Sequence, residues 1–518
     1  MSESIDDLFA RYGPAYRWLA TATGMLGFFS VVFSATIVNV AVPEVMGAFG
    51  VGQDKAQFLA TAFLATMTAS LLLNAWIVDR LGQRYAFILA MVGFATGSVL
   101  SATAGSLELV IFGRAIQGLF SGFVQPLVMV LIFQVFPPDR RGFAMGIFSM
   151  GTVFALGVAP AFGGLVIDAF NWRWVFLAPM PMMVAAFFLG FFFIPSHRRE
   201  TRAAPFDWPG YAFLCLTMFA LVTAISSGQR EGWTSNVILG WFALALVTGG
   251  GFVASQLRPA AGLLNLTLFR NTRFALSIMV ALAFGIGNFS TIYLMPVFGQ
   301  IIQQYTPTEA GLLLMPGSLL AMLLLPMSGR LSDIFQPHKV IMVGLVLFAA
   351  GAWLMATADT HTMFWNVAGF ILIGRVGLAL VNPSLNTAAM QSLPLRNLQQ
   401  GAGILSFAML LGGAVGINAL VVILEQRTQL HSDALTLTQT AANAATREML
   451  DTVRAMLGAG GVPESQQGSA ALHYLGQILT AQADTRGFQD GFMTIALLFI
   501  VALIPAWLFG RTKPQTEP

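Results

Sequence analysis

The stretch Asp79-Arg80-Leu81-Gly82-Gln83-Arg84 lies between two long apolar runs, and the related stretch Gly329-Arg330-Leu331-Ser332-Asp333 lies between two others much further along the chain. Each stretch places charged residues in a short connection whose flanks carry almost none. A second pair follows the same pattern, since Gly113-Arg114 in one apolar run is matched by Gly374-Arg375 in a later one. Paired motifs of this kind indicate a duplicated set of helices, with binding sites expected where the two halves meet.

The composition is that of a membrane protein. Hydrophobic residues make up 56% of the 518 residues and charged residues only 9%, whereas a soluble domain carries about 25% charged residues. The formal charge of +3 is not gathered into a basic stripe, so nucleic acid is not expected as a partner. The single Cys215 excludes an internal disulfide. Metal-ligand and nucleophile motifs are absent, so neither an enzyme nor a cofactor or metal site is expected.

Runs of about 20 apolar residues are long enough to cross a bilayer as helices. The sequence predicts an all-α integral membrane protein with fourteen such segments. They lie near 17–42, 56–78, 85–105, 107–135, 143–168, 173–194, 208–228, 234–255, 273–299, 310–332, 338–358, 363–392, 400–424 and 489–510. An even number of crossings places both termini on one side of the membrane.

The distribution of Lys and Arg predicts which side that is. Alternate short connections and both tails are rich in Arg, whereas the opposite short connections contain only Lys55, Arg173 and Arg230. Because basic residues favour the cytoplasmic side, we expect both termini in the cytoplasm.

The predicted segments group into two halves of six, residues 1–200 and 261–518, separated by two inserted helices within 201–260. The polar segment 425–488 falls on the outer side and is expected to form short amphipathic helices that break near Gly458–Pro463. Two interpretations stay open for this segment: a solvated excursion, or a docking surface for a periplasmic partner.

Five motifs together resemble the major facilitator superfamily, in its fourteen-helix drug:proton antiporter branch of the EmrB/QacA type. They are Asp79–Arg84 after the second predicted helix, Arg114–Gly118 in the fourth, Pro160–Gly164 in the fifth, Thr36–Pro43 in the first and Trp172–Phe176 before the sixth. The similarity covers nearly the whole chain.

This resemblance implies a major facilitator fold of two pseudo-symmetric six-helix bundles plus two inserted helices. It also implies a multi-pass transporter of the bacterial inner membrane that exports amphiphilic drugs or toxic compounds by proton antiport with alternating access. The long outer segment resembles that of members working with a periplasmic adaptor protein and an outer-membrane channel in a tripartite pump. The implied gating residues are Asp79, Arg80, Gly82, Arg84, Gly329, Arg330 and Asp333, and the implied antiporter motif is Pro160, Gly163 and Gly164.

Two arginines lie far inside predicted helices. By helical rise, Arg114 is roughly 10 Å and Arg375 roughly 18 Å from the outer surface, and charges at such depth usually face a cavity or a partner. Ser34 stands at about the depth of Arg114, where the family carries an aspartate. With no carboxylate near the middle of any predicted helix, we expect a preference for anionic or neutral amphiphiles. The proton-coupling residue stays unidentified.

Polar side chains inside the predicted helices are further candidates for contact with substrate or proton, with hydrogen bonds between helices as the alternative. They are Thr36, Asn39, Gln117, Asn288, Tyr293, Asn382 and Asn386.

Two alternatives to multidrug efflux stay open. One is dedicated export of an anionic metabolite, such as a siderophore or fatty acid, which the missing aspartate favours. The other is a non-transporting membrane receptor or scaffold, which the gating motifs at both inner junctions disfavour.

Overall fold

The computed structural model describes residues 3–51, 53–56, 58–196, 206–257, 266–305, 307–440 and 442–512, and every regular element within these ranges is helical. The α-helices are α1 (Ile5–Tyr12), α2 (Tyr16–Phe49), α3 (Gln53–Ala56), α4 (Phe58–Ser70), α5 (Asn74–Thr103), α6 (Leu107–Ser121), α7 (Val124–Val135), α8 (Arg141–Ala169), α9 (Trp174–Leu177), α10 (Met180–Phe193), α11 (Trp208–Glu231), α12 (Asn236–Gln256), α13 (Thr272–Ile301), α14 (Pro307–Ile334), α15 (Pro337–Met355), α16 (Phe364–Gln391), α17 (Leu398–Leu437), α18 (Ala444–Ala459) and α19 (Glu464–Arg511). Short 3-10 turns connect some of them: η1 (Gly13–Ala15), η2 (Leu71–Leu73), η3 (Pro138–Arg140), η4 (Leu266–Arg270) and η5 (Leu395–Asn397).

Twelve helical stretches among the described residues are long and apolar enough to cross a membrane. One of them, Phe58–Thr103, contains two of the predicted segments, and Gly82 interrupts it with a non-helical φ of 78°. Helix α8 covers the predicted segment 143–168 but is not among the twelve. The chain is thus a multi-pass helical membrane protein, and the count of fourteen crossings stays a prediction.

Several helices begin at a polar side chain that caps their first turn. The Ser106 hydroxyl accepts from the backbone N–H of Leu109 at the start of α6, and the Asp207 carboxylate accepts from Gly210 at the start of α11. Such caps satisfy N–H groups that have no partner within their own helix. The apolar runs therefore have defined starts at the ends of the bundle.

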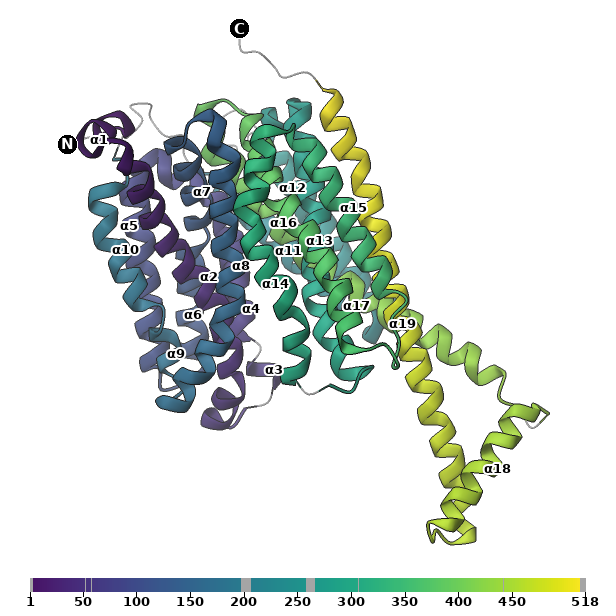
Figure 1. Ribbon diagram of the computed structural model, residues 1–518. Helices are drawn as coiled ribbons and strands as arrows, with labels where there is room; N and C mark the ends of the chain where they lie inside the picture. Colours follow the sequence, from purple (N-terminus) through teal and green to yellow (C-terminus); the bar gives the residue numbers. More distant parts are fainter. Residues whose placement is uncertain are drawn as a thin grey trace.

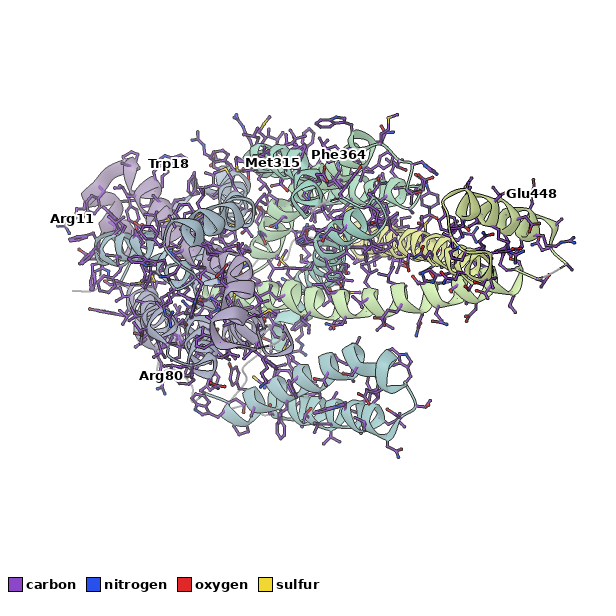
Figure 2. The ribbon with its side chains drawn as sticks, turned by 90° about the horizontal axis from the view of Figure 1, so that it is seen from below. Arg11, Trp18, Arg80, Met315, Phe364 and Glu448 are labelled. Carbon is purple, nitrogen blue, oxygen red and sulfur yellow. The ribbon has the colours of Figure 1, made fainter. Side chains whose placement is uncertain are left out.

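The helices form two groups with an extra pair beside them (Figure 1). Helices α2, α4 to α8 and α10 pack on one another, and so do α13 to α17 and α19. Helices α11 and α12 pack together outside these groups, with α11 against α17 (Figure 2). The termini of the described helices α1 and α19 lie at one end of the bundle, here called the terminal face, and α18 projects beyond the other end, here called the hairpin face (Figure 1).

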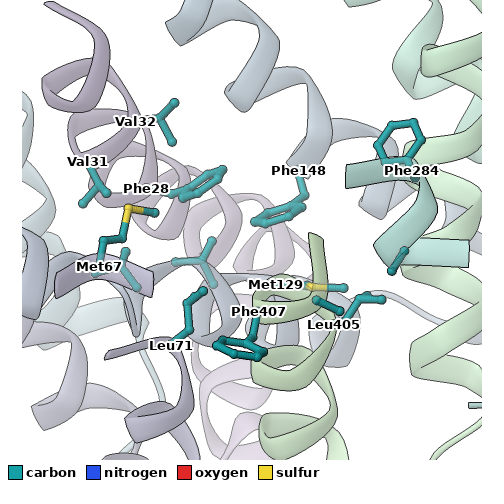
Figure 3. Packing of buried hydrophobic residues seen from close by; sticks show 14 of the residues in the cluster. Phe28, Val31, Val32, Met67, Leu71, Met129, Phe148, Phe284, Leu405 and Phe407 are labelled. Atoms are coloured by element: carbon teal, nitrogen blue, oxygen red, sulfur yellow. The ribbon is translucent and has the colours of Figure 1, made fainter. Parts of the chain in front are cut away.

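The side chains between the two groups are largely apolar. Within the first group, Phe28 of α2 and Phe148 of α8 stack with ring centroids 4.8 Å apart, and Leu71 lies beside Phe407 of the second group (Figure 3). Large apolar side chains also cover the outside of the molecule, among them Leu246, which is 79% exposed. An apolar exterior suits a lipid environment, in which the backbone hydrogen bonds must be satisfied within each helix.

The predicted outer segment 425–488 differs from the expectation of short amphipathic helices. Helix α17 continues without a break to Leu437, and α19 begins at Glu464 and runs through the predicted last crossing, so only α18 is a separate short helix. The predicted break near Gly458–Pro463 is confirmed, because α18 ends at Ala459. Most of the segment therefore consists of membrane helices that extend beyond the bundle.

Candidate functional site

Arg114 lies buried between α2, α4 and α6, with no exposed surface. Its Nη1 donates to the Ser34 hydroxyl at 3.2 Å and to Oε1 of Gln117 at 2.8 Å, and its Nε donates to the backbone carbonyl of Leu59 at 2.9 Å. The guanidinium also lies over the ring of Phe63, 4.1 Å from its centroid. Ser34, which the sequence predicts only at about the depth of Arg114, is thus in hydrogen-bond contact with it.

This arrangement holds the Arg114 side chain without a counter-charge. Its Nη2 has no hydrogen-bond partner, and no carboxylate pairs with it in the part of the chain that the structure describes. Gln117 is itself fixed, because its Nε2 donates to the Ser98 hydroxyl at 2.6 Å. The result is a rigid polar core within the first group of helices, closed to solvent.

Arg375 in α16 has a different environment. Its side chain is partly exposed, its Nε is buried without a partner, and no described residue forms an ion pair or hydrogen bond with it. A Cβ at Gly317 of α14 would lie 3.0 Å from Cγ of Arg375, so the absence of a side chain there makes room for the arginine stem. Of the two matched arginines, Arg114 is locked into its helix group and Arg375 is not.

The other polar residues predicted to contact substrate or proton do not gather into one site. The Thr36 hydroxyl bonds to carbonyls of its own helix, Val32 and Phe33, both at 3.2 Å. Asn288 leaves its buried Oδ1 without a partner, and Tyr293, also on α13, is 40% exposed. The side chain of Asn39 lies outside the described residues.

Asn382 and Asn386 of α16 connect the two groups of helices. Oδ1 of Asn382 accepts from the Ser149 hydroxyl of α8 at 3.1 Å and from Nδ2 of Asn386 at 3.0 Å. These contacts lie within a mostly apolar interface, where hydrogen bonds position the two groups relative to each other.

The junction at Gly329–Asp333 contacts the start of α8 at the terminal face. The Asp333 carboxylate accepts from the backbone N–H of Gly142 at 2.6 Å and of Phe143 at 2.9 Å. A Cβ at Gly329 would lie 2.1 Å from the carbonyl oxygen of Gly142, so glycine is needed for this approach of α14 to α8. Arg330, the remaining gating residue predicted at this junction, is exposed.

The junction at Asp79–Arg84 also lies at the terminal face. Nearby, Nδ2 of Asn74 donates to the carbonyl of Gln399 in α17 at 3.0 Å, which joins the two groups on this side too. Asp79 borders a cavity of about 230 Å³ that Gln399 also lines. Arg80 lies over the ring of Trp76, 4.6 Å from its centroid.

Arg84 holds the N-terminal segment. Its Nη2 contacts Glu3 at 2.6 Å, and its Nε donates to the carbonyl of Ile194 at 2.7 Å. The hydrogen bond and charge of Arg84 lower the pKa of Glu3 below its ordinary value. The segment before α1 is thereby attached to the ends of α5 and α10.

The antiporter motif is described in part. A Cβ at Gly163 would lie 2.7 Å from Cγ1 of Ile37, so this glycine allows close packing of α8 on α2, whereas Gly164 has open space around it. The side chain of Pro160 lies outside the described residues.

Several hydrogen-bond partners of the candidate residues could not be predicted from sequence. The Leu59 carbonyl, the backbone N–H groups of α8 and the carbonyl of Ile194 are main-chain groups, which no residue pattern distinguishes. Glu3 and Ser98 are ordinary polar residues whose partners are far apart in the chain.

Comparison with known proteins decides the family. The sequence profile of the Major Facilitator Superfamily matches residues 24–417. The chain belongs to this superfamily. Its members are membrane transporters.

Relatives within the superfamily include export proteins of similar length. The multidrug export protein EmrB of Escherichia coli (strain K12) is 25% identical and covers 93% of each chain, and EmrB of Haemophilus influenzae is 26% identical over 94% of this chain and 95% of its own. An uncharacterised transporter of Bacillus subtilis, YhcA, is 29% identical over 79% of this chain and 76% of its own.

Solved structures of superfamily transporters have the same fold. The human organic anion transporter MFSD10 superposes with a TM-score of 0.61 at 13% identity, covering 95% of this chain and 99% of its own. The proton:xylose symporter XylE gives a TM-score of 0.61 at 12% identity, covering 96% of each chain.

Proposed function

We propose that the protein is a secondary efflux transporter that exports amphiphilic drugs or toxic compounds by proton antiport with alternating access. Two six-helix bundles, residues 1–200 and 261–518, move relative to each other, with the pair within 201–260 inserted between them. The chain crosses the bacterial inner membrane fourteen times with both termini in the cytoplasm, so the terminal face is the cytoplasmic one. Similarity to multidrug export proteins over nearly the full length supports this function.

The contact between Asp333 and the start of α8 is the observation that carries the proposal. Hydrogen bonds join the two bundles at Gly142–Asp333, Asn74–Gln399 and Ser149–Asn382, and each lies in the part of its helices nearer the terminal face. This pattern is that of an outward-facing state, closed to the cytoplasm. Loading from the cytoplasm requires these contacts to break, and a rocking motion of one bundle against the other does so.

Arg375 is the proposed contact for a charged substrate. Charged side chains inside a membrane normally pair with another charged residue or with backbone carbonyls. Arg375 is partly exposed inside a helix bundle and has no such partner among the described residues. The anionic head of an amphiphile supplies it, while the apolar side chains between the bundles accommodate a varied body. Neutral amphiphiles are the second class we expect to bind.

Arg114 is the proposed positioning residue in the first bundle. Ser34 cannot bind and release a proton at physiological pH, so the exchange of protons is carried by another group, such as a carboxylate or histidine near a membrane edge.

Dedicated export of an anionic metabolite, such as a siderophore or fatty acid, is the second candidate function, and the unpaired Arg375 favours it. The outer helices α17 to α19 support a tripartite arrangement, since they extend beyond the bundle and offer a surface for a periplasmic adaptor linked to an outer-membrane channel. A receptor or scaffold without transport is disfavoured by the contacts that close one end of the bundle.

Proton-linked transport in everted membrane vesicles tests the proposal. A preset pH gradient is challenged with cationic, neutral and anionic amphiphiles, and substrate-triggered collapse by anions or neutral compounds is expected in the wild type. Arg375→Gln is expected to abolish the response to anions and leave that to neutral compounds. A gradient that no class of compound affects, at normal protein levels, contradicts antiport; a response confined to organic cations contradicts the charge assignment.

A further inference from the structure

A groove of about 760 Å³ lies on the hairpin face, outside the path between the two bundles. One side is a strip of α19 that includes Leu472, Gly476 and Asp484. The other side is formed by the end of α13, at Ile301 and Ile302, and by the connection that precedes α16. A volume of this size matches that of drug-sized ligand sites.

The wall opposite α19 is held in place by side-chain hydrogen bonds. The Gln303 side chain donates to the carbonyl of Asp359, and Nε2 of Gln489 donates to the carbonyl of Ala358 at 3.0 Å. Gln304, which borders the groove, has a φ of 56° and turns the chain back after α13. The groove is thus preformed, and binding requires little ordering of its walls.

Asp484 is the charged group inside this groove that lacks a counter-charge. Its side chain is half-buried, and no described residue pairs or hydrogen-bonds with it. Asp490, less than two turns further along α19, shows the contrast: His431 contacts it at 2.9 Å and Arg427 at 3.7 Å. A half-buried carboxylate without a partner is stabilised by a cation that enters beside it.

The remaining lining defines the rest of the ligand. Ile302, Leu472 and Ala481 provide apolar surface for a hydrophobic body. His473 and Gln477, whose side chains contact each other at 3.2 Å, provide a polar rim that faces water. The lining therefore suits a soluble molecule that carries an ammonium group on an apolar body.

We propose that this groove is an external binding site for organic cations, separate from the path of the exported compounds. The ammonium group pairs with Asp484, and the apolar body lies between α19 and the end of α13. The ligand expected here is opposite in charge to the one we expect at Arg375. The two sites therefore differ in the charge of their ligands as well as in their position in the fold.

The test is binding of the cationic dye rhodamine 6G to the full-length protein in nanodiscs of phosphatidylglycerol, followed by fluorescence anisotropy. Asp484→Asn removes the counter-charge. Gly476→Leu adds an apolar side chain to the groove at a position where the new Cβ meets no atom within 4 Å. Each change is expected to weaken binding about tenfold or more.

Control variants outside the groove test whether the loss of dye binding is specific to it. Asp451→Asn removes an exposed carboxylate of α18 that pairs with Arg454, and Ser469→Leu adds an apolar side chain on an exposed part of α19 outside the groove. Both are expected to bind dye as the wild type does, and so is Arg375→Gln, which makes the result independent of the proposed transport site. Melting temperatures establish that each variant is folded.

Three outcomes overturn the proposal. The first is unchanged dye affinity in both Asp484→Asn and Gly476→Leu. The second is equal displacement of the dye by the anion fluorescein. The third is loss of dye binding when phosphatidylethanolamine is added to the nanodiscs, which would assign the groove to a lipid headgroup.

Discussion

The carboxylate of Asp333, at the end of α14, accepts a 2.6 Å hydrogen bond from the backbone N–H of Gly142, in the first turn of α8. A side chain from one bundle thus caps a helix that belongs to the other. The first N–H groups of a helix need partners, and the helix dipole favours a negative charge at that end. Among the contacts that close the terminal face, this one places a negative charge against a helix start.

Replacing Asp333 by Asn is expected to shift the protein away from the state closed at the terminal face. The amide keeps an acceptor but loses the negative charge, a change of about 1–2 kcal/mol or roughly five- to thirty-fold in the ratio of states. Spin labels at Arg140→Cys and Phe335→Cys, in a Cys215→Ser background, report the separation of α8 from α14. Asp139→Asn, which alters an exposed carboxylate nearby, is the control. Equal distance distributions in the two variants would contradict the role of Asp333.

Replacing Gly329 by Ala is also expected to shift the protein away from the state closed at the terminal face, because the added methyl group needs space between the helices. The added Cβ would lie 2.1 Å from the carbonyl oxygen of Gly142, which is backbone and cannot rotate away. The helices must separate, so the labelled distance between α8 and α14 should increase. Gly311→Ala, on the same helix with no atom within 4 Å of the new Cβ, should leave that distance unchanged.

The two matched arginines are expected to differ in their effect on stability. Arg114→Ala leaves the side chain of Gln117 and the carbonyl of Leu59 without their donors, and we expect it to lower the free energy of unfolding by about 2–4 kcal/mol. Arg375→Ala removes no hydrogen bond to a described residue and should change stability by less than about 1 kcal/mol. Unfolding in detergent micelles measures both. Equal losses would show that Arg375 is as structural as Arg114.

The attachment of the N-terminal segment is expected to depend on pH. The pKa of Glu3 is lowered from its ordinary 4.5 by the hydrogen bond and charge of Arg84. The attachment is therefore complete above about pH 4.5 and weakens as the pH falls through the lower, folded-state pKa. Hydrogen-exchange protection factors, which are corrected for the intrinsic effect of pH on amide exchange, should be high for residues 3–12 at neutral pH and lower in acid. Glu3→Gln should show low protection at every pH; protection equal to that of the wild type would contradict the role of this pair.

Residue patterns predicted the class of fold because hydropathy records which residues face lipid. Helical rise also placed Ser34 and Arg114 at a similar depth. Their contact did not follow, because depth does not say which helices are neighbours. The partners of Asp333 did not follow, because backbone N–H groups are the same in every helix. Helical rise gave the depth of Arg375 but no information on whether a neighbouring helix supplies a partner.

The outer segment shows a second limit. The apolar run ends near residue 424, yet α17 continues to Leu437, because residues 425–437 include three Leu and two Gln and contain neither glycine nor proline. A hydropathy boundary marks where lipid ends, and a helix boundary marks where the backbone stops being helical. In this chain the two lie more than ten residues apart.

The unbroken course of α19 has a mechanical consequence. Its 48 residues form one helix from the tip of the outer hairpin to the terminal face, a rod about 72 Å long. Pro505, near its inner end, is the one proline inside this helix. A rod of this kind transmits tilt from one end to the other, so a load applied to the hairpin would displace the helix at the terminal face.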